Sequence, residues 1–181
     1  MLRITKNRIQ EAEPNMLCVI AKLDDAATEK LAALRRIAAP GGKPLYGHIT
    51  IAVYTGDDNA LFIRSCRELL RGIAPFEITY SGIEVLEETS IIVAAPAENE
   101  SLCALHRRIA DVFDASLDRW TKAGVWYPHT TLYFGSQADL CGIADRMRAS
   151  FLPFSARIER IEFSLVLKDG YQIVDALDLS P

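Results

Sequence analysis

Residues 126–135 read WYPHTTLYFG, and the interpretation of the chain begins with them. The segment is typical of a short β-strand that is entered through a proline. Because successive side chains of a strand point to opposite faces, His129 and Thr131 share one face, while Thr130 and Leu132 share the other. One face of this strand therefore presents an imidazole and a hydroxyl together.

A second segment repeats the pattern. Residues 46–54 read YGHITIAVY, which places His48 and Thr50 on one face of a strand and apolar side chains on the other. The chain has three histidines, and two of them lie in these His-x-Thr strands. Each strand is preceded by a loop and followed by a helical pattern, over 44–71 and 128–149. This weak repeat predicts two similar lobes.

Hydrophobic periodicity predicts interleaved elements, in the order strand, helix, strand, helix, strand, strand, helix, strand, helix, strand, strand. The strands are expected near 16–21, 46–54, 76–88, 90–95, 128–135, 154–167 and 171–179. Helices are expected after Asp24 or Asp25, after 56–58, over 99–117, and after a capping pair formed by Ser136 and Asp139. Residues 168–170 predict a hairpin turn, with Gly170 at positive φ. His106 lies at the edge of a buried helical stripe and is expected to be structural.

Bulk composition restricts the class of protein. With 181 residues, half of them hydrophobic, the chain suits one domain over 1–181 made of two small lobes. Its net charge of −4 disfavours a duplex nucleic acid as partner, although a small phosphate or one RNA end needs only a few local cations. We expect no membrane span and no signal peptide, and a monomer in a reducing cytoplasm. The four cysteines are scattered without metal-ligand spacing and are expected to be free thiols: Cys18, Cys66, Cys103 and Cys141.

Two histidines and two threonines suit phosphoryl transfer. Histidine titrates near neutrality, so a pair can provide a general base and a general acid at once. A hydroxyl two residues further along the strand can donate to a phosphate oxygen and stabilise developing charge. One His-x-Thr tripeptide is weak support for this interpretation, but two in matching contexts favour a catalytic pair.

These residues resemble a known superfamily, the 2H phosphoesterases, which include the 2′-5′ RNA ligase-like proteins and the cyclic phosphodiesterases. The resemblance rests on His48-Ile49-Thr50 and on the segment 127–132, and the element order agrees over about 16–179. It implies an α+β fold of two α/β-type lobes with pseudo-twofold symmetry. In such a fold, antiparallel sheets line a central cleft, helices lie outside, and the motifs lie on central strands.

The resemblance also implies an activity. It implies metal-independent opening of a 2′,3′-cyclic phosphate or a related 2′-linked phosphodiester in a small nucleotide or an RNA 3′-end, without a cofactor. Some members join RNA ends through a 2′-5′ bond. By matching positions, His48 and His129 would be the acid–base pair, and Thr50 and Thr131 the phosphate-binding hydroxyls. We favour His129 as base and His48 as acid, although the sequence alone does not assign these roles.

The chain departs from many ligase-like members after the second motif. They carry an arginine there, where this chain has Tyr133-Phe134-Gly135. The departure favours a smaller nucleotide over RNA ligation. Lys43 and Lys122, in the loops before the two motifs, are alternative cations, although solvated lysines are common. The candidate substrate contacts are Lys43, Tyr46, Trp126, Tyr127 and Tyr133. The aromatic residues are candidates because their rings can stack on a base, and packing in the core is the alternative interpretation of these rings.

Two other classes remain as alternatives. A non-catalytic module that binds nucleotides or RNA ends would use the same scaffold, but the survival of all four motif residues favours activity. A metal-dependent hydrolase is disfavoured, because the sequence lacks H-x-H and H-x-x-x-H patterns.

Overall fold

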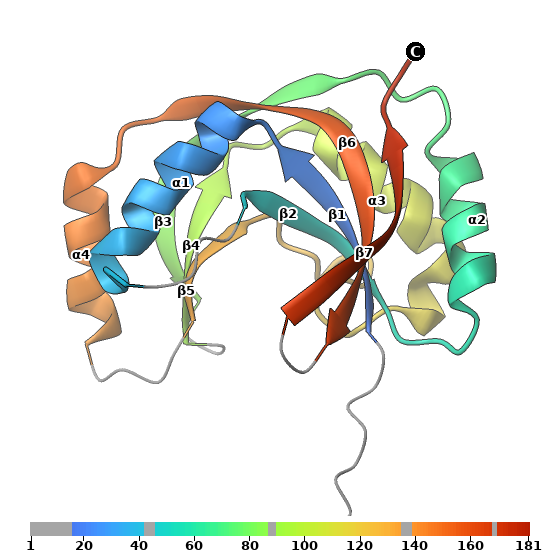
Figure 1. The fold of residues 1–181 in the computed structure, drawn as a ribbon, viewed down its shortest axis with the longest axis horizontal. Helices are drawn as coiled ribbons and strands as arrows, with labels where there is room; N and C mark the ends of the chain where they lie inside the picture. The colour runs from blue at the N-terminus through green and yellow to red at the C-terminus, as the bar shows by residue number, and fades with distance from the viewer. Residues whose placement is uncertain (1–15, 42–45, 87–89, 135–138, 168–169) are drawn as a thin grey trace, which may run out of the picture.

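The computed structural model describes residues 16–41, 46–86, 90–134, 139–167 and 170–181 (Figure 1). The strands are β1 (Leu17–Leu23), β2 (His48–Tyr54), β3 (Phe76–Leu86), β4 (Ile91–Pro96), β5 (Thr130–Phe134), β6 (Phe154–Leu167) and β7 (Gly170–Asp178). The helices are α1 (Asp25–Ala38), α2 (Asn59–Leu69), α3 (Glu100–Phe113) and α4 (Leu140–Ser150), and a 3-10 turn, η2 (Asp114–Ser116), follows α3. The predicted order of elements is confirmed, with α3 shorter than predicted because its last turn becomes η2.

Aspartate and asparagine side chains begin the four helices. Asp24, Asp58, Asn99 and Asp139 each accept a hydrogen bond from the backbone N–H three residues further on. These bonds satisfy N–H groups that have no partner within the helix. Ser136, the other half of the predicted capping pair, lies outside the described residues, as does most of the predicted turn at 168–170. Gly170 has a φ of +153°.

The seven strands form one antiparallel sheet with the order β2-β1-β6-β3-β4-β5, and β7 also pairs with β6. Strand β6 pairs with β1 along one edge. Along its other edge it pairs first with β3 and then with β7. The sheet therefore has two halves, β2-β1-β6-β7 and β5-β4-β3-β6, which share β6. Figure 1 shows α1 and α4 over one half and α2 and α3 over the other.

The motif strands β2 and β5 are the first and last strands of this order, whereas we expected them to be central in their sheets. They are nevertheless in the middle of the molecule, because the two halves bring them into contact with each other (Figure 1). An end strand has one edge without a ladder partner. The motif strands can therefore receive side-chain hydrogen bonds on their backbone carbonyls.

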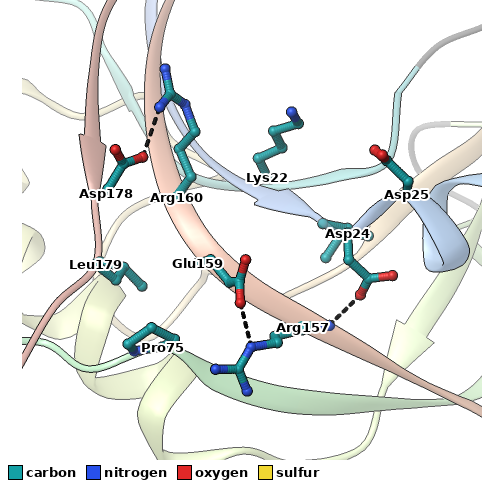
Figure 2. Close-up of a pocket in the computed structure, with 10 residues that line it drawn as sticks. Lys22, Asp24, Asp25, Pro75, Arg157, Glu159, Arg160, Asp178 and Leu179 are labelled. Atoms are coloured by element: carbon teal, nitrogen blue, oxygen red, sulfur yellow. Dashed lines mark hydrogen bonds and ion pairs between the residues drawn. The ribbon is translucent and has the colours of Figure 1, made fainter.

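A charged pocket of about 560 Å³ lies where β1, β6 and β7 approach one another (Figure 2). Several of its charged groups pair with one another. Arg160 contacts Asp178 at 2.7 Å, Arg157 contacts Glu159 at 2.5 Å, and the backbone N–H of Arg157 donates to the Asp24 carboxylate. Exposed ion pairs of this kind contribute little to stability and leave little charge for a ligand. We assign no ligand to this pocket.

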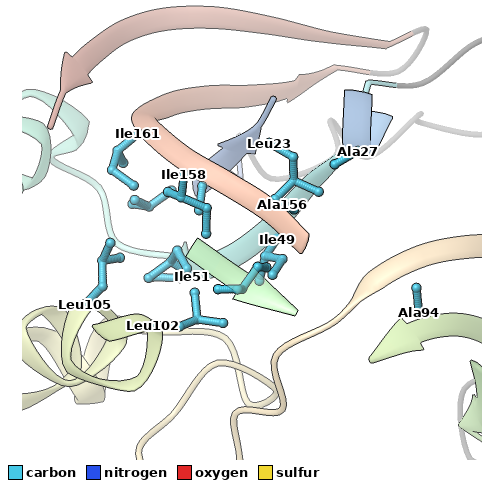
Figure 3. Close-up of a cluster of buried hydrophobic side chains, with 14 of the residues drawn as sticks. Leu23, Ala27, Ile49, Ile51, Ala94, Leu102, Leu105, Ala156, Ile158 and Ile161 are labelled. Carbon is cyan, nitrogen blue, oxygen red and sulfur yellow. The ribbon is translucent and has the colours of Figure 1, made fainter. Parts of the chain in front are cut away.

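The hydrophobic core orients both motifs. Ile49 and Ile51 of β2 are completely buried and belong to a cluster with Leu102 and Leu105 of α3 (Figure 3). Burying one such side chain stabilises the fold by about 1.5–3 kcal/mol, so a one-residue change of register would be costly. With Ile49 and Ile51 inside, His48 and Thr50 must face the other way.

The second motif obeys the same alternation. Thr130 and Leu132 of β5 are buried, while Thr131 and the preceding His129 are only partly buried. The core thus turns both His-x-Thr pairs away from itself, which is the arrangement the sequence predicted.

Candidate active site

Both motif histidines are held in the same way. The Nδ1 atom of His48 lies 3.3 Å from the carbonyl oxygen of Tyr46, and Nδ1 of His129 lies 2.8 Å from that of Tyr127. A carbonyl only accepts hydrogen bonds, so each neutral ring carries its proton on Nδ1. The Nε2 atom of each ring is then the one that can take up or release a proton.

His129 precedes β5 instead of lying within it, contrary to the predicted strand bounds. Its neighbour Pro128 has no N–H to donate to a strand ladder, so pairing with β4 begins at Thr130. The carbonyl of Tyr127, which is free of the ladder, is the group that orients the His129 ring.

Thr130 joins the two motifs, a role that the sequence analysis missed. Its hydroxyl donates to the carbonyl oxygen of His48 at 2.8 Å and lies 2.5 Å from the hydroxyl of Tyr80. Both Thr130 and Tyr80 are completely buried. A hydroxyl on the apolar face of a strand was the available signal, because buried polar groups need partners.

Trp126 makes a second connection between the motif segments. Its indole Nε1–H donates to the carbonyl oxygen of Thr50 at 2.9 Å. Its ring is stacked on His106, with centroids 4.3 Å apart and planes 2° from parallel, and Nε2 of His106 bonds the Thr121 carbonyl at 2.9 Å. His106 is thus the buried structural histidine that we expected, and it holds Trp126 against β2.

Arg35 of α1 makes a third connection, also missed in the sequence. Its Nε and Nη2 atoms both donate to the carbonyl oxygen of Thr131, at 3.1 and 2.8 Å. The motif carbonyls of His48, Thr50 and Thr131 are therefore each bonded by a side chain from a distant part of the chain.

Two pockets lie beside the histidines. One of about 250 Å³ is lined by His48, Tyr46 and Tyr171, and one of about 550 Å³ is lined by His129, Trp126 and Tyr127. Thr50 lines both pockets, so both adjoin the first motif. The larger pocket is mostly apolar and falls within the usual range of small-ligand sites.

The two tyrosines that precede the histidines are each hydrogen-bonded to a carboxylate. The hydroxyl of Tyr46 donates to Glu162 at 3.1 Å, and that of Tyr127 donates to Glu84 at 2.7 Å. Burial is the main cause that raises the pKa of Tyr46, and it raises the pKa of Tyr127 to about 12. Both phenols are therefore neutral and keep their protons near neutral pH.

The remaining predicted contacts are less well supported. Tyr133 packs against the core, and Lys43 lies outside the described residues. Within the described ranges, no group of three or more histidine, cysteine or acidic side chains is arranged to hold a metal ion. None of the described helices is long and apolar enough to span a bilayer.

Burial lowers the pKa of both motif histidines. At His48 the positive charges of Arg35 and protonated His129 add to this lowering, while the Tyr46 carbonyl and Glu162 oppose it. At His129 the Tyr127 carbonyl opposes it. The neutral form of each ring is thus favoured, as a general base requires.

The fold and the paired histidine motifs define the class as the 2H phosphoesterase superfamily. Within this class, the chain belongs to the 2′-5′ RNA ligase superfamily, whose family model matches residues 23–170. No match was found among curated protein sequences.

Solved structures share the fold at low sequence identity. Escherichia coli LigT in its apo form has a TM-score of 0.65 and 16% identity, over 94% of this chain and all of LigT. TT0787 of Thermus thermophilus has a TM-score of 0.64 and 14% identity, over 91% of this chain and 97% of that one. A third structure, described as a phosphoesterase, has a TM-score of 0.63 and 14% identity, over 93% of this chain and all of that one.

Proposed function

We propose that this protein is a metal-independent phosphodiesterase that opens 2′,3′-cyclic phosphates or related 2′-linked phosphodiesters of small nucleotides or RNA ends. The observation that carries the proposal is the matched pair of histidines. Each ring is oriented through Nδ1 by a backbone carbonyl and lines a pocket. Such orientation leaves Nε2 of each ring for proton transfer.

The reaction needs one proton taken up and one released. The neutral histidine removes a proton from water as the water oxygen bonds to phosphorus. The protonated histidine donates a proton to the ribose oxygen as its bond to phosphorus breaks, and the product is a phosphomonoester with a free ribose hydroxyl. The hydroxyls of Thr50 and Thr131 would donate to the phosphate oxygens, where negative charge increases in the transition state.

We now assign the base role to His48 and the acid role to His129, the reverse of the preference drawn from the resemblance. Within the described residues, the charge of Arg35 acts on His48 and disfavours its protonated form. At His129, burial is the main cause of the lowered pKa and the Tyr127 carbonyl opposes it. The member of a pair that stays neutral is the natural base.

The larger pocket supports a nucleotide as substrate. Trp120, Val125 and Tyr127 are at its wall with 40–52% of their surface exposed, so their apolar faces are open to a ligand. Nucleobases stack on aromatic rings such as those of Trp120 and Tyr127, and Val125 adds an apolar contact. LigT of E. coli has been solved in complex with 3′-AMP and with ATP. RNA ligation remains the second candidate, because the matching family carries that name.

The test is turnover of 2′,3′-cyclic nucleotides in the presence of a chelator. His48→Ala and His129→Ala should each lower kcat by roughly 10²–10⁴-fold. Turnover by wild type that both variants retain would refute the histidine mechanism, and activity lost on chelation would indicate a metal enzyme. Ligand binding without turnover would indicate the non-catalytic module.

An aryl phosphodiester separates the two roles. Its phenolate leaves without needing a proton, so the variant that lacks the acid keeps activity on it. His129→Ala should therefore hydrolyse the aryl substrate, whereas His48→Ala should not. The opposite pattern would assign the base role to His129.

A further inference from the structure

Apart from a protonated histidine, the motif segments carry no positive charge of their own. Residues 46–54 and 126–134 contain neither lysine nor arginine. A phosphodiester is an anion, and its charge grows toward the transition state, so positive charge near the site favours the reaction. That charge has to come from another element of the fold.

Arg35 is placed to supply it. Helix α1 packs against β5, and Arg35, in its last turn, reaches the second motif. Two of its donors converge on one carbonyl oxygen, that of Thr131. The planar guanidinium makes such two-point contacts in a fixed geometry, which the single ammonium of lysine does not reproduce. Arg35 therefore fixes the backbone that carries both His129 and the Thr131 hydroxyl.

The same charge acts on the first motif. Burial is the main cause that lowers the pKa of His48; the Tyr46 carbonyl opposes it, the charges of Arg35 and protonated His129 add to the lowering, and Glu162 opposes it. Burial also lowers the pKa of Arg35 itself, so the guanidinium is partly withdrawn from water. Fields between groups shielded from water are screened less than those between exposed groups. One side chain of α1 is thus in hydrogen-bond contact with one motif and in electrostatic contact with the other.

We propose that Arg35 is a positioning residue of the active site, which holds the second motif at Thr131 and supplies the positive field at His48. The inference deepens the proposed phosphodiesterase function and rests on it for the kinetic part of its test. In this proposal, Arg35 of α1 supplies the positive charge that the motif strands lack.

The experiment compares Arg35→Gln, Arg35→Lys and the control Arg36→Gln, which removes an exposed charge from the next position of α1. NMR follows the titration of the His48 and His129 rings, and kinetics follow opening of a 2′,3′-cyclic nucleotide. In the NMR titration, Arg35→Gln should raise the pH midpoint of the His48 ring and leave that of the His129 ring in place. In the kinetics, it should lower kcat on the order of 10–100-fold with less change in KM. Arg35→Lys should keep the His48 midpoint but still lower kcat, because the charge stays and the two-point contact is lost.

Two results would overturn the proposal. One is a His48 midpoint in Arg35→Gln that equals that of wild type. The other is a kcat that falls no further than in Arg36→Gln after correction for the folded fraction. If Arg35→Gln does not fold, Arg35→Lys decides: a lowered kcat with an unmoved His48 midpoint supports the proposal, and full activity refutes it.

The NMR titration also tests the role of Arg35 independently of the proposed phosphodiesterase activity. If wild type turns over no nucleotide, the phosphodiesterase proposal fails while the titration still reports on Arg35. A displaced His48 midpoint in Arg35→Gln, absent in Arg36→Gln, would then support the positioning role, and an unmoved midpoint would refute it.

Discussion

Thr130 and Thr131 are neighbours with opposite expected phenotypes. Thr130→Val replaces a hydroxyl with a methyl of similar size at a completely buried position. The change leaves the His48 carbonyl and the Tyr80 hydroxyl without the partner they share. Each buried group that loses its partner costs about 1–3 kcal/mol, so for two groups we expect a loss of about 2–6 kcal/mol in the free energy of unfolding. For a chain of this size, that lowers Tm by roughly 4–24 °C.

The matched control is Thr131→Val. The Thr131 hydroxyl is partly exposed and has no hydrogen-bond partner within the described part of the chain. This variant should change stability by less than about 0.5 kcal/mol and lower turnover instead. Thermal unfolding followed by circular dichroism, together with kinetics at equal folded fraction, measures both effects.

A double variant tests the cause. Tyr80→Phe removes the hydroxyl that Thr130→Val would leave unpaired, so Tyr80→Phe/Thr130→Val should be less destabilised than the sum of the two single variants. The reasoning fails if Thr130→Val is as stable as Thr131→Val, or if the two effects are additive.

The remaining predictions concern protons and thiols. Because the pKa of both His48 and His129 is lowered, kcat/KM should follow a bell-shaped profile with its maximum below about pH 6.5; a rate that keeps rising above pH 7 would contradict the assignment. Both histidine rings bind a proton more readily in the unfolded chain than in the folded protein. Their contribution to the free energy of unfolding should therefore be fully present above about pH 6.5 and decrease as the pH drops below it. Urea unfolding at pH 7 and pH 5 would measure this decrease. Burial raises the pKa of Cys18 to about 11 and that of Cys66 to about 12, whereas Cys141 is exposed, so iodoacetamide at pH 8 should label Cys141 well before the other two, as read by mass spectrometry.

Local chemistry explains what the sequence predicted well. Asp24 begins α1 because its carboxylate accepts a backbone N–H three residues away, and that signal is contained in the sequence. The alternation of Ile49 and Ile51 with His48 and Thr50 orients the first motif for the same reason. Both features depend only on near neighbours.

The features that were missed depend on distant neighbours. Arg35 looks like a solvated helix residue, and its partner Thr131 lies 96 residues away. The partners of Thr130 lie 50 and 82 residues away, so its hydroxyl could not be given a role. For Trp126 the sequence left open stacking on a base or packing in the core; in the structure its N–H is bonded to Thr50 and one ring face lies on His106. The position of β2 and β5 at the ends of the sheet follows from the three pairings of β6, which no local pattern encodes.

The sharing of β6 by both halves of the sheet has a mechanical consequence. Its 14 residues run without interruption from the pairing with β3 to the pairing with β1 and β7. Two halves joined by a flexible linker can swing on a hinge, but two halves built on one continuous strand cannot separate without breaking its ladder. The distance between the two histidines is thus set when the chain folds, before any substrate arrives. Unfolding should accordingly be a single cooperative transition, and neither half should be obtainable alone as a folded fragment.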